Sequence, residues 1–187
     1  MSASRLIEFA FAFMAAFVVL AFLSFLSMRP ILNEARMEAR AEWDGFMRAV
    51  RERNEVLPGV FEAMKGFEAG HGRIVERALE ARAIAMRATA SDRIVASVDD
   101  LDRQVAQLEK IVQMRPELAQ YPTFAKHWKR VLSVSRRINS ARKDYNNSAR
   151  LYNRLLTPFP QNMLASLFGF VPLTDYPLVR TVGEEES

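Results

Sequence analysis

The segment FAKHWKRVLSVSRRINSARKDYNNSARLYNRLL, residues 124–156, decides the fold class of this chain. A row of mainly apolar side chains recurs in it at steps of three and four residues, which places the row on one face of an α-helix. A helix with one such face needs partners that cover it, because a single helix leaves the face exposed to water. The recurring positions are Phe124, Trp128, Val131, Ser135, Ile138, Arg142, Tyr145, Ala149, Tyr152 and Leu156.

Three earlier segments carry rows with the same spacing, and we therefore predict an all-α fold built around an antiparallel up-and-down four-helix bundle. Pro58 followed by Gly59 favours a turn between the first two segments, with a kink in one long helix as the alternative. The three rows are Leu32, Ala35, Ala39, Trp43, Phe46 and Val50; Val60, Met64, Phe67, His71, Ile74, Ala78, Ala81 and Ala85; and Ile94, Val98, Leu101, Val105, Leu108 and Val112.

An uninterrupted apolar run, FAFAFMAAFVVLAFLSFLSM, precedes these segments and occupies residues 9–28. A helix of this length spans roughly 30 Å, the thickness of the hydrocarbon core of a bilayer. We interpret the run as an uncleaved transmembrane anchor. A cleaved signal peptide is the alternative, but bulky Phe22 and Phe25 occupy the positions where signal peptidases require small residues.

The anchor divides the chain into four parts. These are a short tail (1–8), the anchor (9–28), a helical bundle with a short C-terminal helical or extended cap (29–172) and a flexible tail (173–187). More arginines follow the anchor than precede it, which favours a cytoplasmic position for the C-terminal domain; an exported domain is the alternative. The arginines that follow are Arg29, Arg36, Arg40 and Arg48.

Two strings of sequence resemble the bacterial LemA family. The first is DYNNSARLYNRLLTPFPQNMLASLFGF, residues 144–170, where Tyr-Asn repeats after seven residues and a Phe-Pro turn leads to a terminal Gly-Phe. The second is RNEVLPGVFEAMKGF, residues 53–67, which is similar to a family stretch that usually has Asn where this chain has Gly59. The resemblance implies a membrane-anchored helical bundle in a bacterial inner membrane. It implies no particular activity, although one branch of the family is associated with building magnetosome membranes.

Polar residues within the last helical row are the first candidates for a site. Asparagines recur every seven residues beside two tyrosines, either as a buried hydrogen-bond ladder or as the lining of a groove for a ligand or partner. Arg142 requires a carboxylate or carbonyl partner if it is buried, and Glu42 or Asp44 is the partner we expect. The candidate residues are Asn139, Arg142, Tyr145, Asn146, Tyr152 and Asn153.

Basic residues form a second candidate surface, with Lys129, Arg136 and Lys143 at seven-residue spacing. We expect these side chains to be solvated or paired with acidic residues of 91–114; an anionic lipid surface or an acidic partner is the alternative. We expect no nucleic-acid partner, because no recognition motif accompanies the charge, and 22 acidic residues nearly balance 26 basic ones.

The apolar residues after Pro160 are a third candidate surface. We expect this patch to fold back over the end of the bundle, with insertion into the bilayer interface as the alternative. The patch comprises Met163, Leu164, Leu167, Phe168, Phe170 and Val171.

The sequence favours a protein without catalytic activity, cofactor or metal. It contains no cysteine, its histidines His71 and His127 stand far apart, and it has neither a nucleophile elbow nor a phosphate-binding loop. We predict a single-pass scaffold or interaction protein whose partners are the bilayer, unidentified proteins and a further copy of itself. A ligand-sensing module and an accessory subunit of a membrane protease or quality-control complex are the alternatives.

Overall fold

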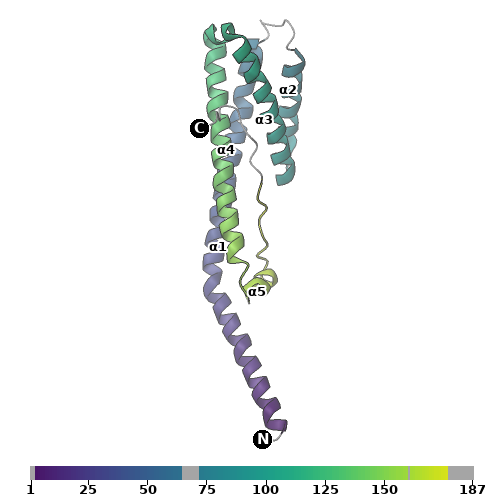
Figure 1. Cartoon of the computed structure of the whole chain (residues 1–187), viewed down its shortest axis with the longest axis vertical. Helices are drawn as coiled ribbons and strands as arrows, with labels where there is room; N and C mark the ends of the chain where they lie inside the picture. Colours follow the sequence, from purple (N-terminus) through teal and green to yellow (C-terminus); the bar gives the residue numbers. More distant parts are fainter. Residues whose placement is uncertain (1–2, 65–71, 160, 177–187) are drawn as a thin grey trace. The chain divides into compact units, whose positions relative to one another are not determined.

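The computed structural model describes residues 3–64, 72–159 and 161–176, in which the regular secondary structure is helical and no β-strand occurs (Figure 1). The prediction of an all-α fold is therefore confirmed. The elements are α1 (Ala3–Met64), α2 (Gly72–Arg87), α3 (Ser91–Met114), the 3₁₀-helix η2 (Pro116–Gln120), α4 (Pro122–Leu155) and α5 (Gln161–Leu167).

The prediction of a turn at Pro58 is wrong, because α1 continues through this residue to Met64. A proline inside a helix costs about 3 kcal/mol or more. On either side of Pro58, however, Leu57, Val60 and Phe61 are all buried, and each gains roughly 1.5–3 kcal/mol from leaving water. The burial outweighs the local penalty. The next described helix begins at Gly72, so four long helices remain.

The chain divides into two compact units, each of which includes part of α1 and part of α4. The bundle unit comprises Glu42–Asp144 and Tyr176–Ser187, and the anchor unit comprises Met1–Ala41 and Tyr145–Asp175.

All four long helices contribute to the core of the bundle unit, where α2 and α3 lie beside the blue part of α1 and the green part of α4 (Figure 1). The predicted rows supply most of this core, since the helical period places their side chains on the inner faces. The buried members are Leu57, Val60, Phe61, Met64, Ala78, Ala81, Leu101, Val105, Leu108, Ile111, Leu118, Phe124, Trp128 and Val131.

Burial follows the predicted rows closely. All ten positions of the row in residues 124–156 are buried, including the polar Ser135 and Arg142. In the first row Trp43 is half-buried and the other five residues are buried. The second row is divided between α1 and α2, and its members Phe67 and His71 lie outside the described residues.

The anchor unit has its own smaller core, to which α1, α4, α5 and the following extended segment contribute. Phe25, although part of the apolar run, is completely buried there. Residues 173–176, which the sequence assigns to a flexible tail, are part of the packed chain: Leu173 joins this core, and Tyr176 is buried in the bundle unit. The core consists of Phe25, Leu32, Ala35, Tyr152, Leu156, Ala165 and Phe170.

Among the described residues, α1 is the helix long and apolar enough to cross a membrane. An 18-residue window of it has a mean hydropathy of 2.6 and is 6% buried. Large side chains between Phe9 and Leu26 are mostly exposed, as expected of a helix surface that faces lipid. The helix begins at Ala3, so most of the expected N-terminal tail is helical backbone.

Candidate functional site

Two arginines and two aspartates form a charge cluster inside the bundle unit. Arg53 of α1 donates a hydrogen bond to Oδ1 of Asp102, and its Nη2 lies 3.5 Å from the carbonyl oxygen of Val98. Arg142 of α4 places Nη1 2.7 Å from Oδ1 of Asp99 and Nη2 4.0 Å from Oδ2 of Asp102. The cluster therefore joins α1 and α4 to α3 with equal numbers of opposite charges.

The expectation that Arg142 takes a carboxylate partner is confirmed, but the partner is Asp99 rather than Glu42 or Asp44. What α1 offers Arg142 is the ring of Phe46, whose centroid lies 5.6 Å from Cζ. A guanidinium over an aromatic ring is attracted by the negative face of the ring. The helical rotation of α1 directs this apolar residue at the arginine, so the acidic contact comes from α3.

Arg53 was not among the predicted site residues, although it is fully buried. The signal was present in the sequence, because Arg53 follows Val50 by three residues and precedes Leu57 by four, on the face that enters the core. An arginine at such a position requires a buried acceptor. Asp102 of α3, four residues after the buried Val98, supplies it.

The hydrogen bonds of Asn153 fasten the extended segment after α5 to α4. Its Nδ2 donates to the carbonyl oxygen of Leu173, and its Oδ1 accepts from the amide of Leu173, each at 2.8 Å. The Tyr145 hydroxyl donates to the carbonyl oxygen of Thr174 at 3.1 Å, and Arg150 pairs with Asp175 at 2.7 Å. The polar row thus holds a distant part of the same chain.

The remaining candidates of the polar row are buried. Asn139 and Arg142 belong to the bundle unit, whereas Asn146 and Tyr152 belong to the anchor unit with Tyr145 and Asn153. Burial raises the pKa of the Tyr152 hydroxyl, an effect that the nearby positive charge of Arg36 partly opposes. The row is divided between two cores, which favours a structural ladder over a single ligand groove.

The predicted basic face is exposed, since Lys129, Arg136 and Lys143 all lie on the solvent side of α4. Arg130 and Arg137, which each follow a residue of this face by one position, both form ion pairs with the carboxylate of Glu52 in α1. These hydrogen bonds and charges, led by the contact with Arg137, lower the pKa of Glu52 despite its partial desolvation.

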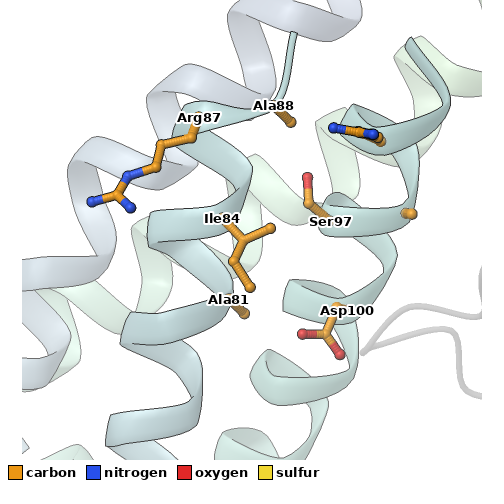
Figure 2. A pocket seen from close by; sticks show the side chains of 8 residues that line it. Ala81, Ile84, Arg87, Ala88, Ser97 and Asp100 are labelled. Carbon is orange, nitrogen blue, oxygen red and sulfur yellow. The ribbon is translucent and has the colours of Figure 1, made fainter. Parts of the chain in front are cut away.

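A hollow of about 500 Å³ lies between the end of α2 and the beginning of α3 (Figure 2). Ile84 and the small side chains form its apolar wall and Asp100 adds a carboxylate, whereas the guanidinium of Arg87 extends away from α3 (Figure 2). The hydroxyl of Ser97 donates to the carbonyl oxygen of Ile94 in its own helix at 2.7 Å. Sequence reasoning missed this hollow, which is lined by Ala81, Ile84, Arg87, Ala88, Arg93, Ala96, Ser97 and Asp100.

A second hollow, of about 560 Å³, follows the outer side of α4 and includes Asn153. Its other lining residues are Asn147, Arg150, Arg154 and Thr157. Among the six predicted candidates of the polar row, Asn153 is the one that lines it.

Metal-binding geometry is absent from the described part of the chain, where no three His, Asp or Glu side chains converge. His127 instead packs against Gly59 of α1, and His71 lies outside the described residues.

The apolar patch near the C-terminus packs against the apolar run of α1. The ring of Phe25 lies 4.8 Å from that of Phe168 and 6.3 Å from that of Phe170. Ala165 and Phe170 are buried, whereas Met163, Leu167, Phe168 and Val171 are exposed. The side chain of Leu164 lies outside the described residues.

A comparison with family profiles matches a region much longer than the two motifs quoted from the sequence. The profile of the LemA family matches residues 42–185, most of the 187-residue chain. The matched range holds the charge cluster, the polar row and the segment that Asn153 fastens. A search of curated proteins finds no match. The chain belongs to the LemA family.

Proposed function

We propose that this protein is a non-enzymatic scaffold of the bacterial inner membrane, which one transmembrane helix anchors and whose helical bundle recruits proteins or organises the membrane. One observation carries the proposal: the polar side chains best suited to bind a ligand or to take part in catalysis already form ion pairs or hydrogen bonds with other residues of the chain. Arg142 is 1% exposed and pairs with Asp99, and Asn153 is hydrogen-bonded to Leu173. We therefore assign the recruitment of partners to the exposed charged side chains and the attachment to the membrane to the apolar run of α1.

The basic face of α4 is the surface that we assign to a partner. Lys129, Arg136 and Lys143 are exposed along one line, where seven-residue spacing keeps them on the same side of the helix. Such a line attracts an acidic protein surface and accelerates its encounter with the bundle. Arg130 and Arg137 contribute less to this attraction, because Glu52 neutralises part of their charge.

Crosslinking mass spectrometry on native membranes tests this assignment. A chain with Lys129→Glu, Arg136→Glu and Lys143→Glu should lose crosslinks to its partners several-fold relative to the native chain. The matched control changes Arg93, Arg103 and Lys110 of α3, which are also exposed, to Glu. The control should retain the crosslinks. Equal behaviour of the two triple variants would remove the basic face as the partner surface.

The non-enzymatic part of the proposal has a separate test. Purified full-length protein should show no hydrolytic or transfer activity above background. An activity that disappears after a point substitution in the bundle would overturn the scaffold and establish an enzyme.

The arginines that follow the anchor support a cytoplasmic bundle. Because the chain contains no cysteine, Met37→Cys creates a unique thiol at an exposed position just beyond the anchor. A membrane-impermeant maleimide should label this thiol after cell lysis and leave it unlabelled in intact spheroplasts. Labelling in intact spheroplasts would place the bundle on the outer side of the membrane.

A further inference from the structure

The C-terminal part of the anchor unit contains a long uncharged stretch. No Asp, Glu, Lys or Arg occurs from Leu155 to Thr174, and Arg154 and Asp175 bound the stretch. Its outward side chains are large, apolar and exposed, with Leu167 exposed by 77%. Exposed apolar side chains gathered in this way mark a surface that meets lipid or another protein. They are Phe159, Met163, Leu167, Phe168 and Val171.

Ring contacts place this stretch beside the apolar run of α1. Phe168 and Phe170 meet Phe25, and the ring of Phe159 stacks at 6.3 Å on that of Phe17. Phe17 precedes the end of the run at Met28 by 11 residues. This separation corresponds to about 16 Å along the helix, approximately one leaflet of hydrocarbon. A segment that contacts both Phe25 and Phe17 therefore lies at the depth of one leaflet when α1 crosses the bilayer.

The backbone of the stretch is suited to an apolar surrounding, where an unsatisfied amide costs several kcal/mol. Three prolines, Pro158, Pro160 and Pro172, have no amide hydrogen to satisfy. At the end of α5, Gly169 adopts a φ of +75°, which allows its own amide to bond Ser166 and the next amide to bond Ala165.

We propose that α5 and its described flanking residues, 157–159 and 168–171, are embedded in the leaflet next to Met28 of α1, with their exposed apolar side chains in contact with lipid acyl chains. The proposal rests on the proposed anchoring of α1 in the bilayer. The anchor unit is then not a single spanning helix with a water-exposed cap. It combines a spanning helix with a short helix that lies beside Phe17 and Phe25, in the leaflet next to Met28.

Site-directed spin labelling tests the proposal in the full chain, reconstituted into vesicles of phosphatidylethanolamine and phosphatidylglycerol. The cysteine-free sequence allows single labels at Leu167→Cys and Met163→Cys, both at exposed positions of α5. Val19→Cys in the apolar run provides the lipid reference, and Met37→Cys provides the water reference. Collisions with oxygen report lipid, and collisions with a water-soluble nickel chelate report water.

We expect the α5 labels to match Val19, with nickel collisions several-fold below those of Met37 and high oxygen collisions. Labels on α5 that match Met37, while Val19 remains in lipid, would overturn the embedding alone. Labels on α5 shielded from both reagents would show a protein partner or a second copy on this surface, which also overturns it. A water-exposed label at Val19 would overturn the anchor and, with it, the proposed function.

Discussion

Gly59 illustrates how one missing atom permits two helices of the bundle unit to approach closely. A Cβ built at this position would lie 2.5 Å from Nδ1 of His127 in α4. Glycine in the middle of a helix is otherwise unfavourable by about 1 kcal/mol relative to alanine. The close packing of the imidazole explains why this chain has a glycine here.

The contact with His127 should therefore reverse the usual effect of a Gly→Ala substitution. We expect Gly59→Ala to lower the free energy of unfolding by about 1–3 kcal/mol, the usual cost of overpacking. In a His127→Ala background the same change should raise stability by about 1 kcal/mol, because helix propensity is then the main difference. Urea unfolding of the full chain in detergent micelles, followed by far-UV circular dichroism, measures both. The same sign in both backgrounds would contradict this explanation.

The charge cluster gives a second prediction for single residues. Asp102→Asn removes the carboxylate shared by Arg53 and Arg142, and leaves buried positive charge without adequate compensation. We expect a loss of about 3–5 kcal/mol in the free energy of unfolding. Asp100→Asn is the matched control on the same helix, where the carboxylate pairs with exposed Arg103. It should change stability by less than about 1 kcal/mol.

An apolar replacement distinguishes lost pairing from lost volume. Arg53→Met combined with Asp102→Leu should recover much of the stability that Asp102→Asn loses, because it removes both members of the buried pair. Denaturant midpoints measured under the same micelle conditions would show the recovery. If the double variant were less stable than Asp102→Asn, the intact ion pair would stabilise the fold more than apolar side chains in the same place do.

Tyr145 and Tyr152 should respond differently to loss of the hydroxyl. Tyr145→Phe removes the hydrogen bond to Thr174 and should cost about 0.5–1.5 kcal/mol. Tyr152→Phe should be close to neutral at pH 7, because the described residues offer its hydroxyl no hydrogen-bond partner. Unfolding free energies of the two variants, compared with that of the native chain, give the result. A larger cost at Tyr152 would contradict the assignment.

The raised pKa of Tyr152 makes the stability depend on pH in the alkaline range. Below its ordinary pKa of 10.0 the hydroxyl is neutral in both folded and unfolded chains. Above that pH the unfolded chain releases the proton first, so stability falls until the pH passes the higher pKa of the folded state. Tyr152→Phe should therefore lessen the decline in unfolding free energy between about pH 9 and pH 11.

At the scale of elements, the main feature is how α4 holds the extended segment that follows α5. The side-chain amide of Asn153 bonds both the amide and the carbonyl group of Leu173, as a neighbouring β-strand would. The segment thus obtains backbone hydrogen bonds without forming a sheet. Arg150 adds an exposed ion pair with Asp175, which contributes little by itself.

We expect Asn153→Ala to release this segment while α4 remains helical. Two lost hydrogen bonds correspond to about 1–3 kcal/mol. Hydrogen exchange with mass spectrometry should show faster exchange of peptides that cover Leu173 and Thr174, with unchanged exchange in α3. Ser140→Ala, at an exposed position of α4, is the control and should leave these peptides protected. Unchanged protection in Asn153→Ala would show that apolar packing alone holds the segment.

At the scale of the whole molecule, the apolar run of α1 is part of a folded core. Phe25 is completely buried in the anchor unit by Phe168 and Phe170. An anchor whose residues face lipid on every side would not contribute to a core in this way. The C-terminal segment and the run therefore stabilise one another.

Removal of residues 1–28 should consequently destabilise the anchor unit. We expect the shortened chain to expose Phe170, and more of the already exposed Phe168, and therefore to self-associate and to bind a hydrophobic dye. It should also lose at least the roughly 3–5 kcal/mol typical of truncating a buried phenylalanine. Light scattering after size-exclusion chromatography and denaturant unfolding measure these effects. A chain that lacks only residues 1–16 keeps Phe25 and should retain stability. A monomeric, equally stable 29–187 fragment would contradict the prediction.

The sequence by itself determined that the chain is helical, which side chains form most of the buried faces, and where the apolar run lies. These follow from the spacing of apolar side chains, which is a local property read directly along the chain. Arg142 could be predicted to need an acidic partner for the same reason, since its place in the buried row is evident from spacing. The resemblance to the LemA family was likewise present in contiguous motifs.

Only the tertiary structure decided which groups meet. Asp99 rather than Glu42 pairs with Arg142 because the rotation of each helix about its axis is set by packing of the whole core. Asn153 binds the backbone of Leu173, and backbone groups are alike in every residue, so no sequence signal marks that partner. The continuation of α1 through Pro58 also depended on tertiary structure, because the gain comes from burial against other helices and the penalty is local.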